Sequence, residues 1–230
     1  MTYRDRYHLE PLLVRAMLRS GVVGDAFLPL DGMLLYQAHR EWAGPQTVTL
    51  PGEYSAQGGL SLPLDKAQFA NHDYSKWYWY YKCSWAQWPE HTVEASDHWN
   101  KRFDAHLADL IDFEDKRGQV IVEKGQYKAY HHIVFYRSAL WVEWYCVGDK
   151  VEIEALLSTV THIGKKSSQG WGRVNRWEIK AISDDYSVWY GDTLMRGVPP
   201  SEAPGYPTGV YGIRPSYWNK NNQMLLALPE

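Results

Sequence analysis

The chain has 230 residues, enough for one large domain or two small ones. It is 45% hydrophobic and 22% charged, which is the range of a soluble globular protein. A formal net charge of −3 excludes a uniformly basic protein that binds nucleic acid over its whole surface.

The first third of the chain predicts a strand, a helix and a long connection. Hydrophobic and polar residues alternate in the second half of 9–20, which predicts a strand. Residues 30–42 have helical spacing, and Gly44 and Pro45 mark the end of that helix. Residues 44–76 are rich in Gly, Pro, Ser and Gln and predict a long loop with weak strands at most. The aromatic run at 76–88 predicts the next strand.

The middle of the chain predicts one amphipathic helix and three strands. Residues 96–118 carry apolar residues at helical spacing, and Gly118 is suited to end that helix. Its polar face is acidic, so it is expected to point away from any nucleic acid. Strand-like runs follow at 119–124, 127–137 and 139–148.

A second helix is predicted over 149–164, with Asp149 as its N-cap and Gly164 as its end. The alternation of 173–183 predicts the strand that follows, and 222–230 suggests an edge strand. The order is therefore strand, helix, insertion, strands, helix, glycine-rich loop and strand.

This order is the β-α-β-β-α-β plan of an α+β, ferredoxin-like (RRM-like) domain. We expect a single domain over residues 1–230 with a large insertion at about 44–120. A segment rich in Gly, Pro and Tyr, at about 184–230, completes the chain.

The basic residues are concentrated around the predicted loop. Residues 162–180 hold five basic residues and one acidic residue, a local charge of +4, which leaves −7 on the rest of the chain. A basic patch on an acidic body favours an oriented contact with a polyanion. An ordinary solvated loop is the alternative.

The loop lies in the stretch THIGKKSSQGWGRVNRWEI, residues 161–179, and does not match a nucleotide-binding loop. A P-loop and a dinucleotide-binding turn both run from a strand into a helix, so that helix amides face phosphates. Here a helix is predicted before the loop and a strand after it. Both nucleotide-binding classes are therefore excluded.

The loop nevertheless carries phosphate-binding chemistry. Its glycines allow close approach to a ligand, its lysines supply point charges, and Arg173 supplies a planar fork. Trp171 offers a stacking face between two glycines. This mixture suits single-stranded RNA with unstacked bases. The alternative is a helix C-cap followed by a flexible turn.

Aromatic composition adds to the case for a binding surface. The chain has 12 Trp and 17 Tyr against 5 Phe. Trp and Tyr carry a polar edge and serve both base stacking and protein interfaces, so a protein-interaction module is a further interpretation. Most of the four tryptophans of the 76–88 run are expected in the core: Trp77, Trp79, Trp85 and Trp88.

Three stretches resemble the RAMP superfamily of CRISPR-associated proteins. HIGKKSSQGWGRVNRWEI (162–179) resembles the glycine-rich loop and following strand of that superfamily. GDAFLPLDGMLLYQAHRE (24–41) looks like the first-helix region of the RAMP subunit of type IV CRISPR effectors. GIRPSYWNKNNQ (212–223) is similar to the C-terminal segment of that family.

The resemblance implies a Cas-five-type subunit, which caps the 5′ handle of the guide RNA in a multisubunit complex for defence against foreign DNA. Its implied partners are the guide RNA, the backbone and large subunits, and target DNA indirectly. The insertion would act as a thumb that separates handle from guide. The RNA-binding role carries over to Gly164, Lys165, Lys166, Ser167, Ser168, Gln169, Gly170, Trp171, Gly172 and Arg173.

Some relatives in the superfamily cleave RNA, so a metal-independent endoribonuclease is the alternative. Such cleavage needs a base for the 2′-hydroxyl and an acid for the leaving oxygen. By analogy, His39 with Tyr36 or Arg40 would supply these groups. His131 and His132 are adjacent on a predicted strand and point to opposite faces, so only one could enter a site. We expect a non-catalytic subunit.

No metal or cofactor is expected. Cys83 and Cys146 lie in apolar surroundings and are expected to be buried, reduced thiols. His91 and His98 have no third ligand in a zinc pattern. The chain has no recognisable signal peptide and no apolar run of about 20 residues, so a cytoplasmic protein without membrane contact is expected.

Overall fold

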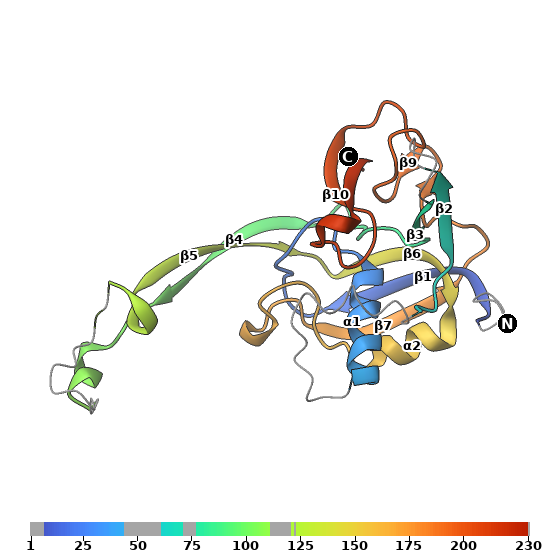
Figure 1. The fold of residues 1–230 in the computed structure, drawn as a ribbon. Coiled ribbons are helices and arrows are strands. Elements are labelled where there is room, and N and C mark those ends of the chain that lie inside the picture. The colour runs from blue at the N-terminus through green and yellow to red at the C-terminus, as the bar shows by residue number, and fades with distance from the viewer. Residues whose placement is uncertain (1–6, 44–60, 71–76, 111–120, 122, 230) are drawn as a thin grey trace.

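The computed structural model describes residues 7–43, 61–70, 77–110, 121 and 123–229. Figure 1 shows a body in which strands lie against two helices, an arm of two strands that projects from the body, and a C-terminal part packed beside the sheet. No helix of the described residues is long and apolar enough to cross a membrane.

The centre of the body is an antiparallel sheet. Strand β1 (Leu9–Leu18) lies between β6 (Trp141–Asp149) and β7 (Val174–Ala181). Residues 82–88 add an irregular fourth strand, because they pair with the free side of β6 through isolated antiparallel bridges. The order of this layer, with β1 and β6 inside, is compatible with the predicted ferredoxin-like plan.

Two helices cover one face of this sheet: α1 (Leu30–Ala43) and α2 (Lys150–Ser158). Alternate side chains of β1, namely Leu12, Val14 and Ala16, are fully buried in the resulting core. Successive strand residues point to opposite faces, so the predicted alternation has placed one set under the helices. Both helices start within two residues of their predicted positions.

Helix α2 is shorter than predicted. Asp149 is its N-cap, as expected, because its carboxylate accepts the N–H groups of Val151 and Glu152. The prediction that the helix continues to 164 is wrong, since it ends at Ser158. Residues 159–163 instead run beside the start of β7. The β-branched residues in this segment favour extended backbone, and its N–H and C=O groups find partners across the loop.

The prediction of a helix over 96–118 is wrong for residues 96–110, where the arm stands instead, and 111–118 lie outside the described residues. Strands β4 (Val93–Lys101) and β5 (Tyr130–Ser138) form a long antiparallel hairpin that projects from the body (Figure 1). Of the described residues in that range, only the short 3-10 segment Ala105–Leu110 is helical. The apolar residues of this range have helical spacing, but Trp99, one of them, lies on a strand and pairs across the hairpin with His132.

The arm lies between the 82–88 strand and β6 in chain order. The predicted strand at 127–137 corresponds to β5, and the one at 139–148 to β6. Of the insertion placed at about 44–120, the parts at 44–60, 71–76 and 111–120 lie outside the described residues, as does most of the predicted strand at 119–124.

A second core joins the C-terminal part to the body. The remaining strands are β2 (Lys66–Ala70), β3 (Trp77–Tyr81), β8 (Trp189–Tyr190), β9 (Thr193–Leu194), β10 (Thr208–Gly212) and β11 (Gln223–Ala227). They pair as the hairpins β2–β3, β8–β9 and β10–β11, and the last of these confirms the strand predicted near the C-terminus. Tyr80 of β3 packs with Leu194, Val198 and Leu226 in this core.

Arg196 fixes the C-terminal part to the sheet. Its side chain is completely buried and donates hydrogen bonds to the carbonyl oxygens of Tyr81, Cys83 and Ile213. The two cysteines are free and buried, as predicted, and lie opposite each other on 82–88 and β6. Trp85 is also buried, and Trp79 and Trp88 pack against the main core.

Candidate functional site

The glycine-rich loop, residues 164–173, is anchored to the connection between β1 and α1. The Lys165 N–H donates to the Val23 carbonyl at 2.6 Å, and the Gly172 N–H donates to the Gly21 carbonyl at 2.7 Å. The Ser20 hydroxyl also donates to the Gly170 carbonyl at 2.8 Å. The loop therefore has a defined position beside the start of α1.

Two of the loop glycines are required by close packing. A Cβ on Gly172 would lie 1.8 Å from the Ile163 carbonyl oxygen, and one on Gly164 would lie 2.5 Å from the Val23 carbonyl oxygen. Both glycines have φ near +70°, where other residues are strained. Gly170 has a φ of +88°, but a Cβ there would meet no atom within 4 Å, so only its turn conformation favours glycine.

The structure brings the ten predicted site residues into one loop but does not expose them equally. Lys166 and Trp171 are half-buried, and Gly172 is buried. The exposed members are Gly164, Lys165, Ser167, Ser168, Gln169, Gly170 and Arg173. The N–H of Gly172 is already used inside the protein, so the polar contacts open to a ligand come from the exposed group.

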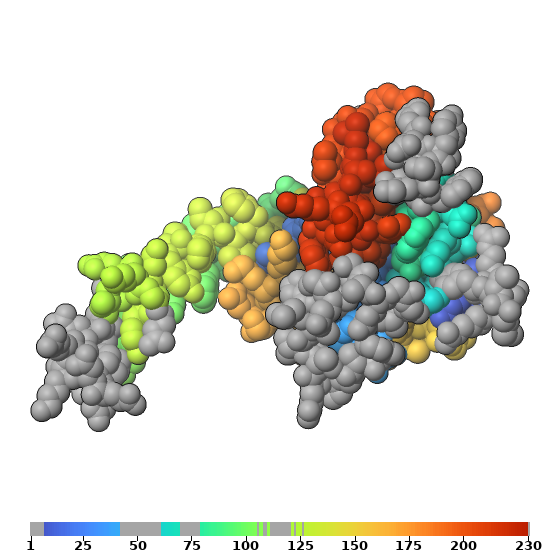
Figure 2. Space-filling view, viewed as in Figure 1, coloured from blue at the N-terminus to red at the C-terminus, as the bar shows by residue number. Residues whose placement is uncertain are grey.

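The loop contacts the arm, which sequence reasoning missed. The Lys166 ammonium lies 5.5 Å from the centre of the Trp99 ring, and the rings of Trp171 and Tyr136 pack with centroids 4.7 Å apart. Figure 2 shows the loop, in orange, beside the yellow-green root of the arm. Loop and arm thus form one continuous surface.

A groove of about 570 Å³ separates the loop from α1. The cations Arg40 and Lys165 line it, together with Tyr36, which is half exposed. The Arg40 guanidinium lies 5.8 Å from the centre of the Tyr36 ring. Among the described residues that line the groove, Asp25 is the one acidic residue, and its carboxylate accepts a hydrogen bond from the Tyr211 hydroxyl.

The three residues considered for RNA cleavage are not brought together. Tyr36 and Arg40 line the groove, because they are four residues apart on one face of α1. His39 is only 3% exposed and does not line it. Within the described part of the chain, the histidine that lines the groove is His162, whose Nδ1 lies 2.9 Å from the Thr161 hydroxyl oxygen.

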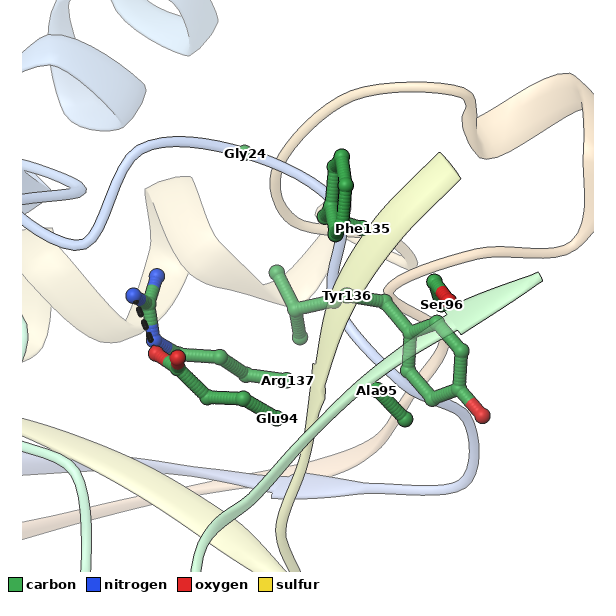
Figure 3. A pocket seen from close by; sticks show the side chains of 8 residues that line it. Gly24, Glu94, Ala95, Ser96, Phe135, Tyr136 and Arg137 are labelled. Atoms are coloured by element: carbon green, nitrogen blue, oxygen red, sulfur yellow. Dashed lines mark hydrogen bonds and ion pairs between the residues drawn. The ribbon is translucent and has the colours of Figure 1, made fainter. Parts of the chain in front are cut away.

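A second hollow, of about 380 Å³, lies at the root of the arm (Figure 3). Arg137 and Glu94 form an ion pair on one side of it at 2.6 Å. Phe135, which is 74% exposed, stands on the other side near Gly24. Gly24 and its neighbourhood line both hollows, so the groove and the arm root meet there.

The two neighbouring histidines of β5 point to opposite faces of the arm, as predicted. His131 faces His98 and Asn100, with a distance of 2.9 Å between the His98 Nδ1 and His131 Nε2 atoms. His132 instead stacks parallel to Trp99 on the other face, with centroids 6.3 Å apart. Only the His132 face is shared with the glycine-rich loop.

The comparison with protein families decides the identity of the chain. The model for CRISPR type IV associated protein Csf3 matches residues 10–229, which is nearly the whole length. The chain belongs to the Csf3 family. The match confirms the resemblance to the type IV RAMP subunit. The comparison with curated proteins finds no match.

The stretches that suggested the Csf3 family meet in the structure. The 24–41 stretch and the glycine-rich loop line the same groove. The 212–223 stretch joins them because the Tyr217 hydroxyl donates to both carboxylate oxygens of Asp31, at 2.7 and 2.8 Å. Burial raises the pKa of Asp31, while Arg196 and the Tyr217 hydrogen bond oppose that shift.

Proposed function

We propose that this member of the Csf3 family is a non-catalytic, RNA-binding subunit of a type IV CRISPR effector complex. In this proposal it caps the 5′ handle of the guide RNA. The observation that carries the proposal is the groove in which cations of the loop and of α1 flank an exposed aromatic ring. The family match supplies the CRISPR context.

The groove suits a single strand of RNA for two reasons. Arg40 and Lys165 can neutralise phosphates along the groove, and Arg173 adds an exposed cation on the same loop. Tyr36 offers a ring on which an unstacked base can lie. A duplex would present its phosphates outward and hide its bases, so it would leave the ring unused.

The arm gives the proposed RNA path a direction. Its root continues the groove through Gly24, and exposed Phe135 stands at that point. We place the handle in the groove and the guide beyond the arm, so that the arm separates them. The backbone and large subunits would then bind the guide side, and target DNA would be contacted through the guide.

The test is the binding of a fluorescently labelled, repeat-derived RNA. Replacing Lys165 and Lys166 together with alanine should weaken binding and flatten its dependence on salt. Each lost phosphate contact with a single strand makes the negative slope of log K against log salt shallower by about 0.7, so loss of the contact of the exposed Lys165 gives roughly 0.7.

A matched control is the double variant Lys150→Ala with Lys180→Ala. These two lysines lie near the opposite end of the sheet, where Asp149 pairs with Leu9 and Lys180 pairs with Leu13. The control variant should keep the affinity and the slope of the native chain. Equal losses in the two double variants would remove the loop from the RNA site.

The non-catalytic part of the proposal has its own test. The purified chain should leave a repeat-derived RNA intact both in EDTA and in magnesium. His39, the histidine considered for the endoribonuclease alternative, is buried away from the groove, which favours this outcome. Site-specific cleavage would establish the endoribonuclease instead, and loss of cleavage in His162→Ala or His39→Ala would identify its histidine.

A further inference from the structure

A third hollow, of about 270 Å³, lies next to the groove, between the start of α1 and residues 215–218. Tyr36 and Trp218 form two of its walls, and they are 50% and 54% exposed. Leu35 and Pro215 complete a lining that is mostly carbon. Two large, half-exposed rings thus enclose one small apolar space.

The floor of this hollow is fixed. The Tyr217 hydroxyl is bound to the buried Asp31 carboxylate, and a ring atom of Tyr217 lies 3.6 Å from where a Cβ on Gly32 would be. The Asn222 side-chain amide donates to the carbonyl oxygens of Pro215 and Ser216, at 3.1 and 3.2 Å. A ligand therefore meets a floor that is already in place, which lowers the entropic cost of binding.

The charge around the hollow indicates what it holds. Tyr36 lines both this hollow and the groove, and the Arg40 guanidinium lies over its ring. Lys165 lines the same groove. The site thus combines an apolar space between two rings with cations alongside, which matches a nucleotide, whose apolar base face is joined to an anionic phosphate. An apolar peptide side chain would fill the hollow but make no use of the cations.

We propose that Tyr36 and Trp218 hold one unstacked base of the bound RNA, while its neighbouring phosphates lie on Arg40 and Lys165. This inference rests on the proposed function, because it assigns one nucleotide of the same RNA to a particular place. Stacking faces dominate the lining, so the hollow should favour the larger rings of purines rather than read one base by its hydrogen-bonding edge.

The experiment combines protein variants with a series of repeat-derived RNAs that each lack one base. With the native chain, one abasic position should weaken binding about tenfold, which corresponds to roughly 1.4 kcal/mol and lies within the range for base stacking on an aromatic ring. With Trp218→Ala, the intact RNA should bind about tenfold more weakly, and that same abasic position should cost nothing further. Tyr190→Ala removes an exposed ring elsewhere and should behave as the native chain.

A second readout does not depend on a truncated side chain. A 2-aminopurine placed at the sensitive position should lose fluorescence on binding the native chain and Trp218→Phe, since both keep a stacking ring. It should be brighter on Trp218→Leu, which fills space but leaves Tyr36 as the one stacking ring of the proposed pair.

Three outcomes separate the two proposals. The base-holding role is refuted, while RNA binding stands, if each abasic position weakens binding by the same factor in the native chain and in Trp218→Ala. It is also refuted if the probe stays bright on the native chain. If those results come with weaker binding of a neighbouring subunit by Trp218→Ala, the hollow is a protein contact instead. If the native chain does not bind repeat-derived RNA, both the proposed function and this inference are refuted.

Discussion

Replacing Gly172 with alanine is expected to disrupt the glycine-rich loop much more than replacing Gly170. Both positions have positive φ, and left-handed backbone costs an alanine about 1–2 kcal/mol. At Gly170 the new methyl group meets nothing within 4 Å, so this strain is the whole cost. At Gly172 it would lie 1.8 Å from the Ile163 carbonyl oxygen and 2.9 Å from the carbonyl carbon, so the backbone must move.

That movement strains or breaks the hydrogen bond from the Ile163 N–H to the Gly172 carbonyl and the one from the Gly172 N–H to the Gly21 carbonyl. Two such bonds and the overpacking together cost at least about 2 kcal/mol beyond the backbone strain. Urea unfolding of the two variants measures this difference directly. Equal losses of unfolding free energy in Gly172→Ala and Gly170→Ala would refute the close-packing argument.

Three further outcomes follow from buried groups. Burial raises the pKa of Asp31, so the folded state binds the proton of this carboxyl more tightly than the unfolded state does. The contribution of this group to the unfolding free energy therefore falls as pH rises above the pKa of an unfolded Asp, about 3.9. Asp31→Asn stays neutral and should gain stability relative to the native chain as pH rises above about 4 in urea unfolding; a stability difference that does not change with pH would contradict this. Tyr217→Phe should lower the unfolding free energy by about 1–3 kcal/mol, since it removes a donor from a buried carboxyl. Burial raises the pKa of both cysteine thiols, so a disulfide reagent should label Cys83 and Cys146 only after unfolding, and fast labelling of the native chain would contradict their burial.

The parts of the fold that were predictable carry local signals. The alternation in β1 and β7 and the helical spacing in α1 each report which side of one element is buried. Asp149 marks the start of α2 by a hydrogen bond within its own first turn. Such signals depend on neighbours a few residues away, so a single sequence contains them in full.

The arm was missed because its stabilising contacts are distant in sequence. Trp99, Phe103 and Leu107 have the spacing of a helical stripe, yet Trp99 lies on a strand whose partner is more than thirty residues further on. Helical periodicity indicates a helix only where its apolar side packs on a core. Much of the arm is exposed on both sides, so the periodicity there has no such core. Only the pairing with β5 distinguishes the hairpin from a helix.

The sequence indicated which kind of ligand the candidate site would suit, but not all the residues that form it. The glycines and cations of the loop could be recognised from the sequence, because their residue types limit what such a loop can bind. The rotation of α1 decided the rest: it turns Tyr36 and Arg40 toward the loop and buries His39. Trp99 and Tyr136 joined the surface only through the fold of the arm.

The contact between Asp31 and Tyr217 makes the C-terminal segment part of the site. A carboxyl buried at the start of α1 needs hydrogen bonds, and it receives them from a residue 186 positions further along the chain. The same contact sets the turn that carries Trp218 beside Tyr36. The segment therefore cannot be moved or lost without changing the wall of the third hollow, next to the groove. Three stretches far apart in the sequence, 24–41, 162–179 and 212–223, thus meet at neighbouring surfaces of the fold.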